Sequence, residues 1–123
     1  MSVEAVARKF VELCNQGKNF DVMETMYAPD IVSVEGDGAE TVGKGPVIEK
    51  SRRWVEVNDF HGEKVRGPYF SGGSASAGQF AVHFTLDITR KATGQRVTLE
   101  EVGLYTVKND RIMREQFFYD GDH

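Results

Sequence analysis

Apolar residues recur at helical spacing in the opening segment of the chain. They stand three or four residues apart, at Val3, Val6, Phe10 and Leu13. This spacing places them on one face of a helix. We therefore expect a helix over residues 3–16, which Ser2 caps and Gly17 ends.

Two further helices are predicted before residue 60. Asp21 and Glu24 have the spacing of a capping box. Pro29 disfavours helical geometry at the residue before it, so this second helix is expected over residues 21–28. A third helix is expected over residues 46–57, where a proline suits the first turn and the apolar residues of one side are Val47, Ile48, Trp54 and Val55.

Alternating apolar and polar positions replace the helical spacing from residue 60 onward and predict strands. The alternation is clearest over residues 78–89, with further strands expected over 96–107 and 111–119 and weaker ones over 31–34 and 60–70. Residues 71–74 are expected to form a hairpin loop, and Asn109 and Asp110 a tight two-residue turn.

The order of these elements predicts the fold class. Helices that are segregated from a run of antiparallel strands indicate an α+β fold rather than a parallel βαβ fold. A strongly curved antiparallel sheet wrapped around the three helices would bury the apolar faces of both. We expect one domain over residues 1–123, because the chain has no internal repeat and no linker.

Composition and charge exclude several functional classes. The chain is 40% hydrophobic and 28% charged, which is typical of a globular protein, and its single cysteine, Cys14, permits neither an internal disulfide nor a cysteine-based zinc site. A net charge of −4 argues against nucleic acid as a partner. No apolar run approaches the roughly 18 residues of a membrane helix. Because Glu4 and Glu12 interrupt the N-terminal apolar pattern, a signal peptide is not expected, and we predict a cytoplasmic protein.

The expected turn at residues 109–110 predicts which residues of the last two strands lie opposite each other. If Lys108 pairs with Arg111, then Tyr105 faces Arg114, and Arg114 lies on the apolar face of the sheet. A β-bulge, which is common in curved sheets, would turn the side chains of the last strand to the opposite face of the sheet. The residues turned inward would then be Glu115, Phe117 and Tyr119. Both registers remain open at this point.

Glu101 is a carboxylate on an otherwise apolar face. Placing Phe84 opposite Glu101 gathers the apolar residues of the two preceding strands on one side, which favours that register. Burial of an unpaired carboxylate is costly, so Glu101 should have a partner or a raised pKa. It is either an acid or base in a pocket or one half of a buried ion pair with Arg114.

Several segments together resemble a known family. Residues 8–13, residues 26–30, Gly45 before the third helix, and residues 110–120 are similar to ketosteroid isomerases and to SnoaL-type polyketide cyclases. Both belong to the nuclear transport factor two-like superfamily. The resemblance implies a cone, in which a bent sheet and three helices enclose an apolar cavity. It also implies a homodimer through the outer face of the sheet.

The resemblance carries over to the isomerase site only in part. The general-base carboxylate falls on Glu35, at the end of the first short strand. The two donors of the oxyanion hole fall on Phe10 and Gly103, neither of which has a donor side chain, and this argues against ketosteroid isomerisation itself. Glu101, if protonated, would supply a replacement acid. The alternative for Glu35 is a solvated residue in a glycine-rich turn.

These observations lead to a leading function and two alternatives. The leading function is an isomerase, cyclase or dehydratase that acts on an apolar carbonyl compound, with Glu35 and Glu101 as base and acid. The alternatives are a non-catalytic protein that binds a hydrophobic small molecule, and a subunit whose cavity is filled by its own side chains. The residues expected to line the pocket are Phe10, Trp54, Phe84, Tyr105, Arg114, Glu115, Phe117 and Tyr119.

No cofactor and no metal are predicted. The side chains most typical of metal ligands, Asp120, Asp122 and His123, cluster at the C-terminus. Terminal residues are usually mobile, and no other pattern in the sequence completes a site with them.

Overall fold

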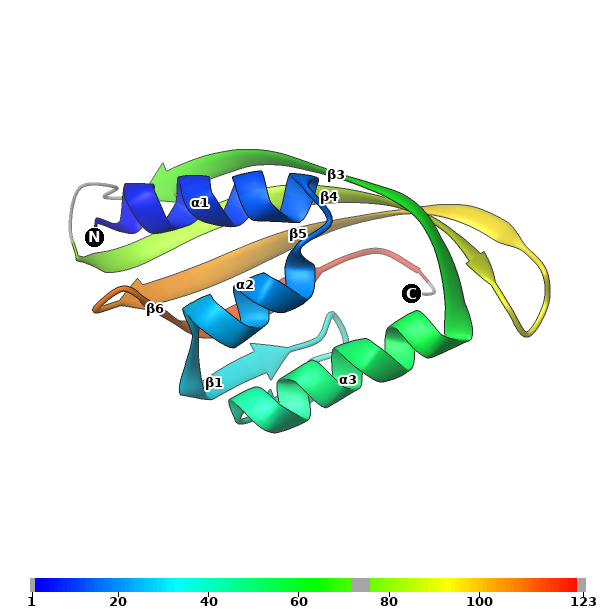
Figure 1. The fold of residues 1–123 in the computed structure, drawn as a ribbon, viewed down its shortest axis with the longest axis horizontal. Coiled ribbons are helices and arrows are strands. Elements are labelled where there is room, and N and C mark those ends of the chain that lie inside the picture. The colour runs from blue at the N-terminus through cyan, green and yellow to red at the C-terminus, as the bar shows by residue number, and fades with distance from the viewer. Residues whose placement is uncertain (1, 72–75, 122–123) are drawn as a thin grey trace.

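Three helices lie against one face of a curved sheet in the computed structural model, which describes residues 2–71 and 76–121 (Figure 1). The helices are α1 (Val3–Asn15), α2 (Asn19–Met26) and α3 (Lys44–Val57). The strands are β1 (Tyr27–Val34), β2 (Glu40–Val42), β3 (Asn58–Ser71), β4 (Ala77–Arg90), β5 (Arg96–Lys108) and β6 (Arg111–Phe118). This arrangement confirms the α+β class and the curved sheet around three helices.

The sheet has the strand order β2-β1-β6-β5-β4-β3. The predicted run of four consecutive antiparallel strands is confirmed in β3, β4, β5 and β6, and β2 is antiparallel to β1. The strands β1 and β6 run parallel. The short strand β2 lies between β1 and α3, where the sequence predicted neither a helix nor a strand. The expected hairpin loop at 71–74 lies outside the described residues apart from Ser71, the last residue of β3.

The first helix forms as its sequence predicts. Ser2 is the N-cap, and its Oγ accepts a hydrogen bond of 3.1 Å from the backbone N–H of Ala5. Gly17 follows the helix with a φ of 77°, a left-handed conformation that glycine adopts without strain. The apolar face of α1 is buried against β3 and β4, where it forms part of the core.

The second helix ends earlier than predicted. The expected capping box does not form, because Lys18 is the N-cap and no side chain caps the helix. Tyr27 and Ala28 belong to β1, where both are buried. Pairing of Tyr27 with Ile112 of β6 therefore overrides the helical pattern at this position. Pro29 is accommodated in β1 because the pairing with β6 is interrupted between Tyr27 and Val32.

The β4–β5 register matches the prediction, and Phe84 lies opposite Glu101. In the last hairpin Lys108 pairs with Arg111, and the turn residues 109–110 have φ values of 51° and 66°, as a tight two-residue turn requires. The register then shifts by one residue, so that Tyr105 lies opposite Glu115 rather than Arg114. The bulged register is therefore the one that the chain adopts.

The core contains a cluster of aromatic rings at the junction of α1, β4 and β5. The Phe10 ring lies 5.5 Å from Phe80 and 4.5 Å from Tyr105, centroid to centroid. Phe80 and Tyr105 stack at 5.1 Å. This cluster fills the part of the cone beside α1 with side chains and leaves the part beneath α2 and α3 for the cavity described below. Within residues 2–71 and 76–121, no helix has the length and apolar character needed to cross a bilayer.

Candidate functional site

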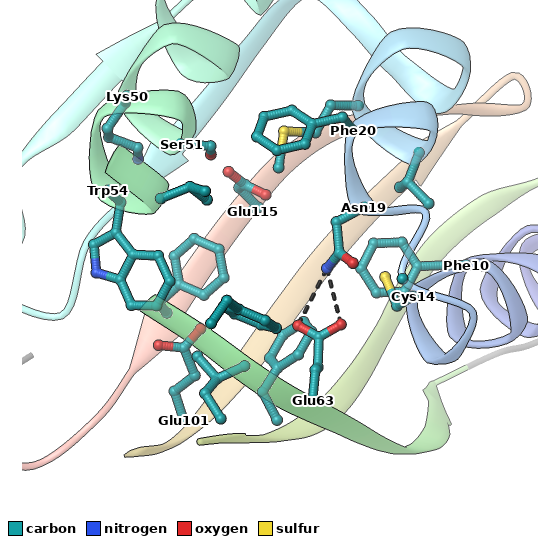
Figure 2. A pocket seen from close by; sticks show the side chains of 18 of the residues that line it. Phe10, Cys14, Asn19, Phe20, Lys50, Ser51, Trp54, Glu63, Glu101 and Glu115 are labelled. Atoms are coloured by element: carbon teal, nitrogen blue, oxygen red, sulfur yellow. Dashed lines mark hydrogen bonds between the residues drawn. The ribbon is translucent and has the colours of Figure 1, made fainter. Parts of the chain in front are cut away.

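A cavity of about 960 Å³ lies between the helices and the concave face of the sheet. Its walls are mostly apolar and include Phe60, Phe84, Leu86 and Phe117. Phe20 and Trp54, labelled in Figure 2, also line it. A cavity of this size and lining suits a small organic ligand. The charged side chains that reach it are therefore the candidates for chemistry.

The carboxylate of Glu35 is part of a hydrogen-bonded series of polar side chains. Glu35 follows β1, and a tight backbone turn to Gly38 and Ala39 holds it there. Its Oε1 lies 2.5 Å from the Nζ of Lys50, which comes from α3. Tyr119 donates a longer hydrogen bond of 3.4 Å to the other carboxylate oxygen, Oε2. Glu35 is thus an oriented, ion-paired carboxylate at the cavity wall.

The hydrogen-bonded series of side chains continues inward from Lys50 to Glu115. The Lys50 ammonium also donates to the Oγ of Ser33 at 2.8 Å, and this hydroxyl donates to Glu115 Oε2 at 2.7 Å. The Tyr27 hydroxyl donates to the other oxygen of Glu115. Ser33 and Glu115 are both buried. Four residues from β1, α3 and β6 are therefore joined into one network.

Glu115 has two neutral donors and almost no contact with solvent. Burial raises the pKa of this carboxyl, and the hydrogen bonds from Tyr27 and Ser33 act in the opposite direction. Both oxygens are held by hydroxyl groups, so the side chain is fixed in position. Glu115 is therefore suited to anchoring the network rather than to meeting a ligand.

Glu101 enters the cavity from β5, on the wall that Figure 2 shows below Trp54. Burial, followed by the negative charges of Glu35, Glu115 and Glu63, raises the pKa of Glu101 to about 7, although the ammonium of Lys50 acts in the opposite direction. Near neutral pH this carboxyl is therefore present in both protonation states. A group in that condition can donate or accept a proton during a reaction.

A further carboxylate, Glu63, enters the cavity from β3. Its two oxygens accept hydrogen bonds of 3.0 and 3.1 Å from the side-chain amide of Asn19, drawn as dashed lines in Figure 2. Burial raises the pKa of Glu63, and the bond from Asn19 lowers it. In the part of the chain that the structure describes, no group of three His, Cys, Asp or Glu side chains is arranged to hold a metal ion. Asp122 and His123 lie outside the described residues.

The structure brings nine of the ten expected site residues to this cavity. They are Glu35 and Glu101, together with Phe10, Trp54, Phe84, Tyr105, Glu115, Phe117 and Tyr119. Arg114 is the exception. The regular register of the last hairpin, in which Tyr105 would face Arg114, was therefore wrong. The bulge in β6 turns Glu115 inward, and because side chains alternate along a strand, Arg114 faces the convex side of the sheet. The ion pair between Arg114 and Glu101, one of the two alternatives for Glu101, is therefore not formed.

Four residues of the site were missed: Tyr27, Ser33, Lys50 and Glu63. The spacing of α3 contained a signal for Lys50, which stands three residues after Val47 and four before Trp54 and so shares their face of the helix. Glu63 could not be placed, because β3 has an irregular register beside Gly62. Tyr27 was assigned to a helix rather than to a strand.

Gly103 lies beneath two aromatic rings of the cavity wall. A Cβ at this position would lie 2.7 Å from Cε2 of Tyr105 and 2.9 Å from Cε2 of Phe84. Both distances are shorter than carbon atoms tolerate. The packing of these rings therefore excludes a donor side chain at position 103.

The SnoaL-like domain family matches residues 1–119 of this chain. Among solved structures, a Mesorhizobium loti protein provisionally named a SnoaL-like polyketide cyclase, with carbohydrate phosphatase in brackets, is 43% identical. The match covers 97% of this chain and 100% of that one, with a TM-score of 0.88. No curated protein matches the chain.

More distant structures share the fold alone. A Xanthomonas campestris protein provisionally named a polyketide cyclase is 16% identical, with 94% of this chain and 88% of that chain covered and a TM-score of 0.73. A Catenulispora acidiphila protein with a ketosteroid isomerase-like fold, solved in complex with trimethylamine, is 15% identical. That match covers 94% and 85% of the two chains, with a TM-score of 0.72.

Proposed function

The chain belongs to the SnoaL-like domain family, and on this premise we propose that it is an isomerase, cyclase or dehydratase acting on an apolar carbonyl compound. The reaction begins with removal of a proton from the carbon beside the carbonyl group. Glu35 acts as the base, and protonated Glu101 acts as the acid. The substrate is an uncharged, largely hydrophobic molecule that fits a cavity of about 960 Å³.

One observation carries this proposal: two carboxyl groups in different electrostatic states face one apolar cavity. Glu35 forms an ion pair of 2.5 Å with Lys50. Glu101 has a pKa of about 7, because burial and three neighbouring carboxylates disfavour its charge. Two carboxyl groups whose surroundings separate their protonation states are the arrangement that acid–base catalysis requires.

The experiment is deuterium exchange from heavy water into cyclic ketones and β-diketones, followed by mass spectrometry. We expect the wild-type protein to accelerate exchange above the buffer rate, and Glu35→Gln to lower that acceleration by about 100-fold or more, since it removes the base. Glu101→Gln should cause a smaller loss, because the amide still donates a hydrogen bond. Glu49→Gln, an exposed change on the same helix as Lys50, is the matched control and should leave exchange unchanged.

A non-catalytic binding protein is the second candidate function. The ion pair with Lys50 favours it, because an ammonium 2.5 Å away already occupies one oxygen of the Glu35 carboxylate. Under this alternative the apolar cavity holds a hydrophobic molecule without changing it. If all four proteins fold and none accelerates exchange into any compound of the panel, the binding function replaces the enzymatic one.

A further inference from the structure

Removing a proton beside a carbonyl group leaves negative charge on the carbonyl oxygen. Without a donor at that oxygen, the enolate in an apolar cavity is very unfavourable. The two positions at which the resemblance would place donors have none, because Phe10 is a hydrocarbon ring and the packing around Gly103 excludes a side chain. Protonated Glu101, the acid of the proposed reaction, replaces one of these two donors, and the second must come from elsewhere in the cavity.

Lys50 has the chemistry and the position for this role. An ammonium group has three N–H donors. Among the described residues two of them are used, by Ser33 at 2.8 Å and Glu35 at 2.5 Å. Lys50 lines the cavity from α3. Its third donor is therefore available to a ligand in the cavity.

The network behind Lys50 fixes the ammonium in place. Ser33 is buried and accepts from Lys50 while it donates to Glu115. Glu115 is held in turn by Tyr27. A donor that is held before the reaction needs no reorganisation when charge develops on the substrate, and this is the property that makes an oxyanion site effective.

We propose that Lys50 is a catalytic residue that binds the oxyanion of an enolate formed in this cavity. The inference rests on the proposed acid–base function. Oε2 of Glu35 takes the proton from carbon, and the electron pair of the broken C–H bond forms the C=C bond of the enolate. The π electrons of the carbonyl group move to oxygen, which accepts a hydrogen bond from Lys50. Glu35 later returns the proton to carbon, so that no other reactant is consumed.

The charge balance supports this assignment. Before proton transfer the negative charge is on Glu35, beside Lys50. After transfer Glu35 is neutral and the charge is on the enolate oxygen, again beside Lys50. The ammonium therefore has a negative partner throughout, and the net charge of the cavity does not change. This costs less than creating a new charge in a cavity that already contains Glu63, Glu101 and Glu115.

The test is ligand binding, measured by calorimetry at neutral pH. The probe is phenindione, an apolar cyclic diketone that exists as a stable enolate in neutral solution. The comparison ligand is phenylindanone, which has a similar ring system and no charge. The variants are Lys50→Met, which removes charge and donor, and Lys50→Gln, which keeps an amide that can reach Ser33 and preserve the fold. Arg52→Met removes one positive charge from an exposed site on the same helix and is the matched control.

We expect Lys50→Met and Lys50→Gln to weaken phenindione binding by about 10- to 100-fold, as for the loss of a hydrogen bond between charged groups. Binding of phenylindanone should change by less than about twofold, and Arg52→Met should resemble wild type. Equal binding of phenindione by wild type and both variants overturns the proposal, as does equal weakening of both ligands or no binding of phenindione to wild type. Lys50-dependent enolate binding in a protein without exchange activity supports the oxyanion site and refutes the acid–base function.

Discussion

Glu101 illustrates how the surroundings of a residue change its chemistry. Its neighbours along β5 are ordinary strand residues, and its register opposite Phe84 places it against the apolar wall. Burial contributes most to its raised pKa, and the charges of Glu35, Glu115 and Glu63 act in the same direction. The ammonium of Lys50 opposes them. A carboxyl group with an ordinary pKa of 4.5 thereby titrates near neutrality.

This raised pKa predicts a pH-dependent stability. Because the native pKa of about 7 exceeds the unfolded value of 4.5, the folded protein binds this proton more tightly, and the free energy of unfolding falls as pH rises between the two values. Glu101→Gln removes this contribution. Relative to wild type, the variant should gain about 1–3 kcal/mol between about pH 5 and about pH 8. Urea denaturation at several pH values measures the difference, and a difference that does not vary with pH contradicts the assignment.

Gly103 provides a prediction about packing. Its backbone conformation is one that other residues adopt, but a Cβ would collide with the rings of Tyr105 and Phe84. Gly103→Ala should therefore lower the free energy of unfolding by about 1–3 kcal/mol through overpacking. Gly62→Ala is the control, because Gly62 is also a strand glycine without left-handed geometry and a Cβ there would have no atom within 4 Å. Equal stability of the two variants in chemical denaturation would contradict this prediction, because it would mean that the rings of Tyr105 and Phe84 move aside without cost.

Among the elements, β6 decides which charged residues the cavity contains. Val107 pairs with Ile112, and the next pair along the strands is Thr106 with Arg114, so Met113 is the additional residue of a β-bulge. Beyond this point each side chain of β6 lies on the face of the sheet opposite to the one that it would occupy in a hairpin without the bulge. Glu115 and Phe117 reach the cavity for this reason, and Arg114 does not.

The bulge predicts that deletion of Met113 and deletion of Gln116 have different effects. Without Met113 the hairpin becomes regular, Tyr105 stays opposite Glu115, and Glu115 and Phe117 still face the cavity. Without Gln116 the side chains beyond Glu115 change faces, and Phe117 turns away from the core against which it packs. We expect the first deletion to cost less than about 2 kcal/mol and the second about 3 kcal/mol or more. Thermal melts of both proteins test this, and similar melting temperatures would refute the role of the bulge.

The elements also show why the fold could be predicted more fully than the site. The helix α1, the helix α3 and the β4–β5 register follow from local spacing, because each buries one face of a regular element. The end of α2 could not be predicted, since Tyr27 is drawn into β1 by pairing with a strand eighty-five residues later in the chain, at Ile112. The face on which Glu63 lies likewise depends on an irregular register, in this case between β3 and β4.

At the scale of the whole molecule, the cone has one face whose apolar side chains remain exposed. Val102 of β5 lies opposite Phe118 of β6, and they are 40% and 49% exposed. His83 of β4 lies opposite Val102 and continues the same row across the sheet. Tyr69 of β3, on the convex side by its pairing with Ala81, is 60% exposed. The helices cover only the other face of the sheet (Figure 1).

We propose that this convex face joins two copies of the chain in a homodimer. The row of His83, Val102 and Phe118 spans three adjacent strands, and exposed apolar surface of this kind is typical of protein interfaces. A two-fold axis over Val102 would place each Phe118 against the partner's sheet, so that the same residues are buried on both copies. Neither copy would need to change the cavity, which opens on the opposite side of the sheet.

The dimer prediction is tested by light scattering coupled to size-exclusion chromatography. We expect the wild-type protein to elute with twice the mass of the chain, and Val102→Glu to elute as a monomer, because each dimer would bury two carboxylates beside Phe118. Val57→Glu is the control, since Val57 is 60% exposed but ends α3 on the opposite side of the sheet, and this variant should remain dimeric. A monomeric wild type, or a dimer that Val102→Glu leaves intact, would exclude this face as the interface. Circular dichroism on the same samples confirms that the introduced glutamates have not unfolded the sheet.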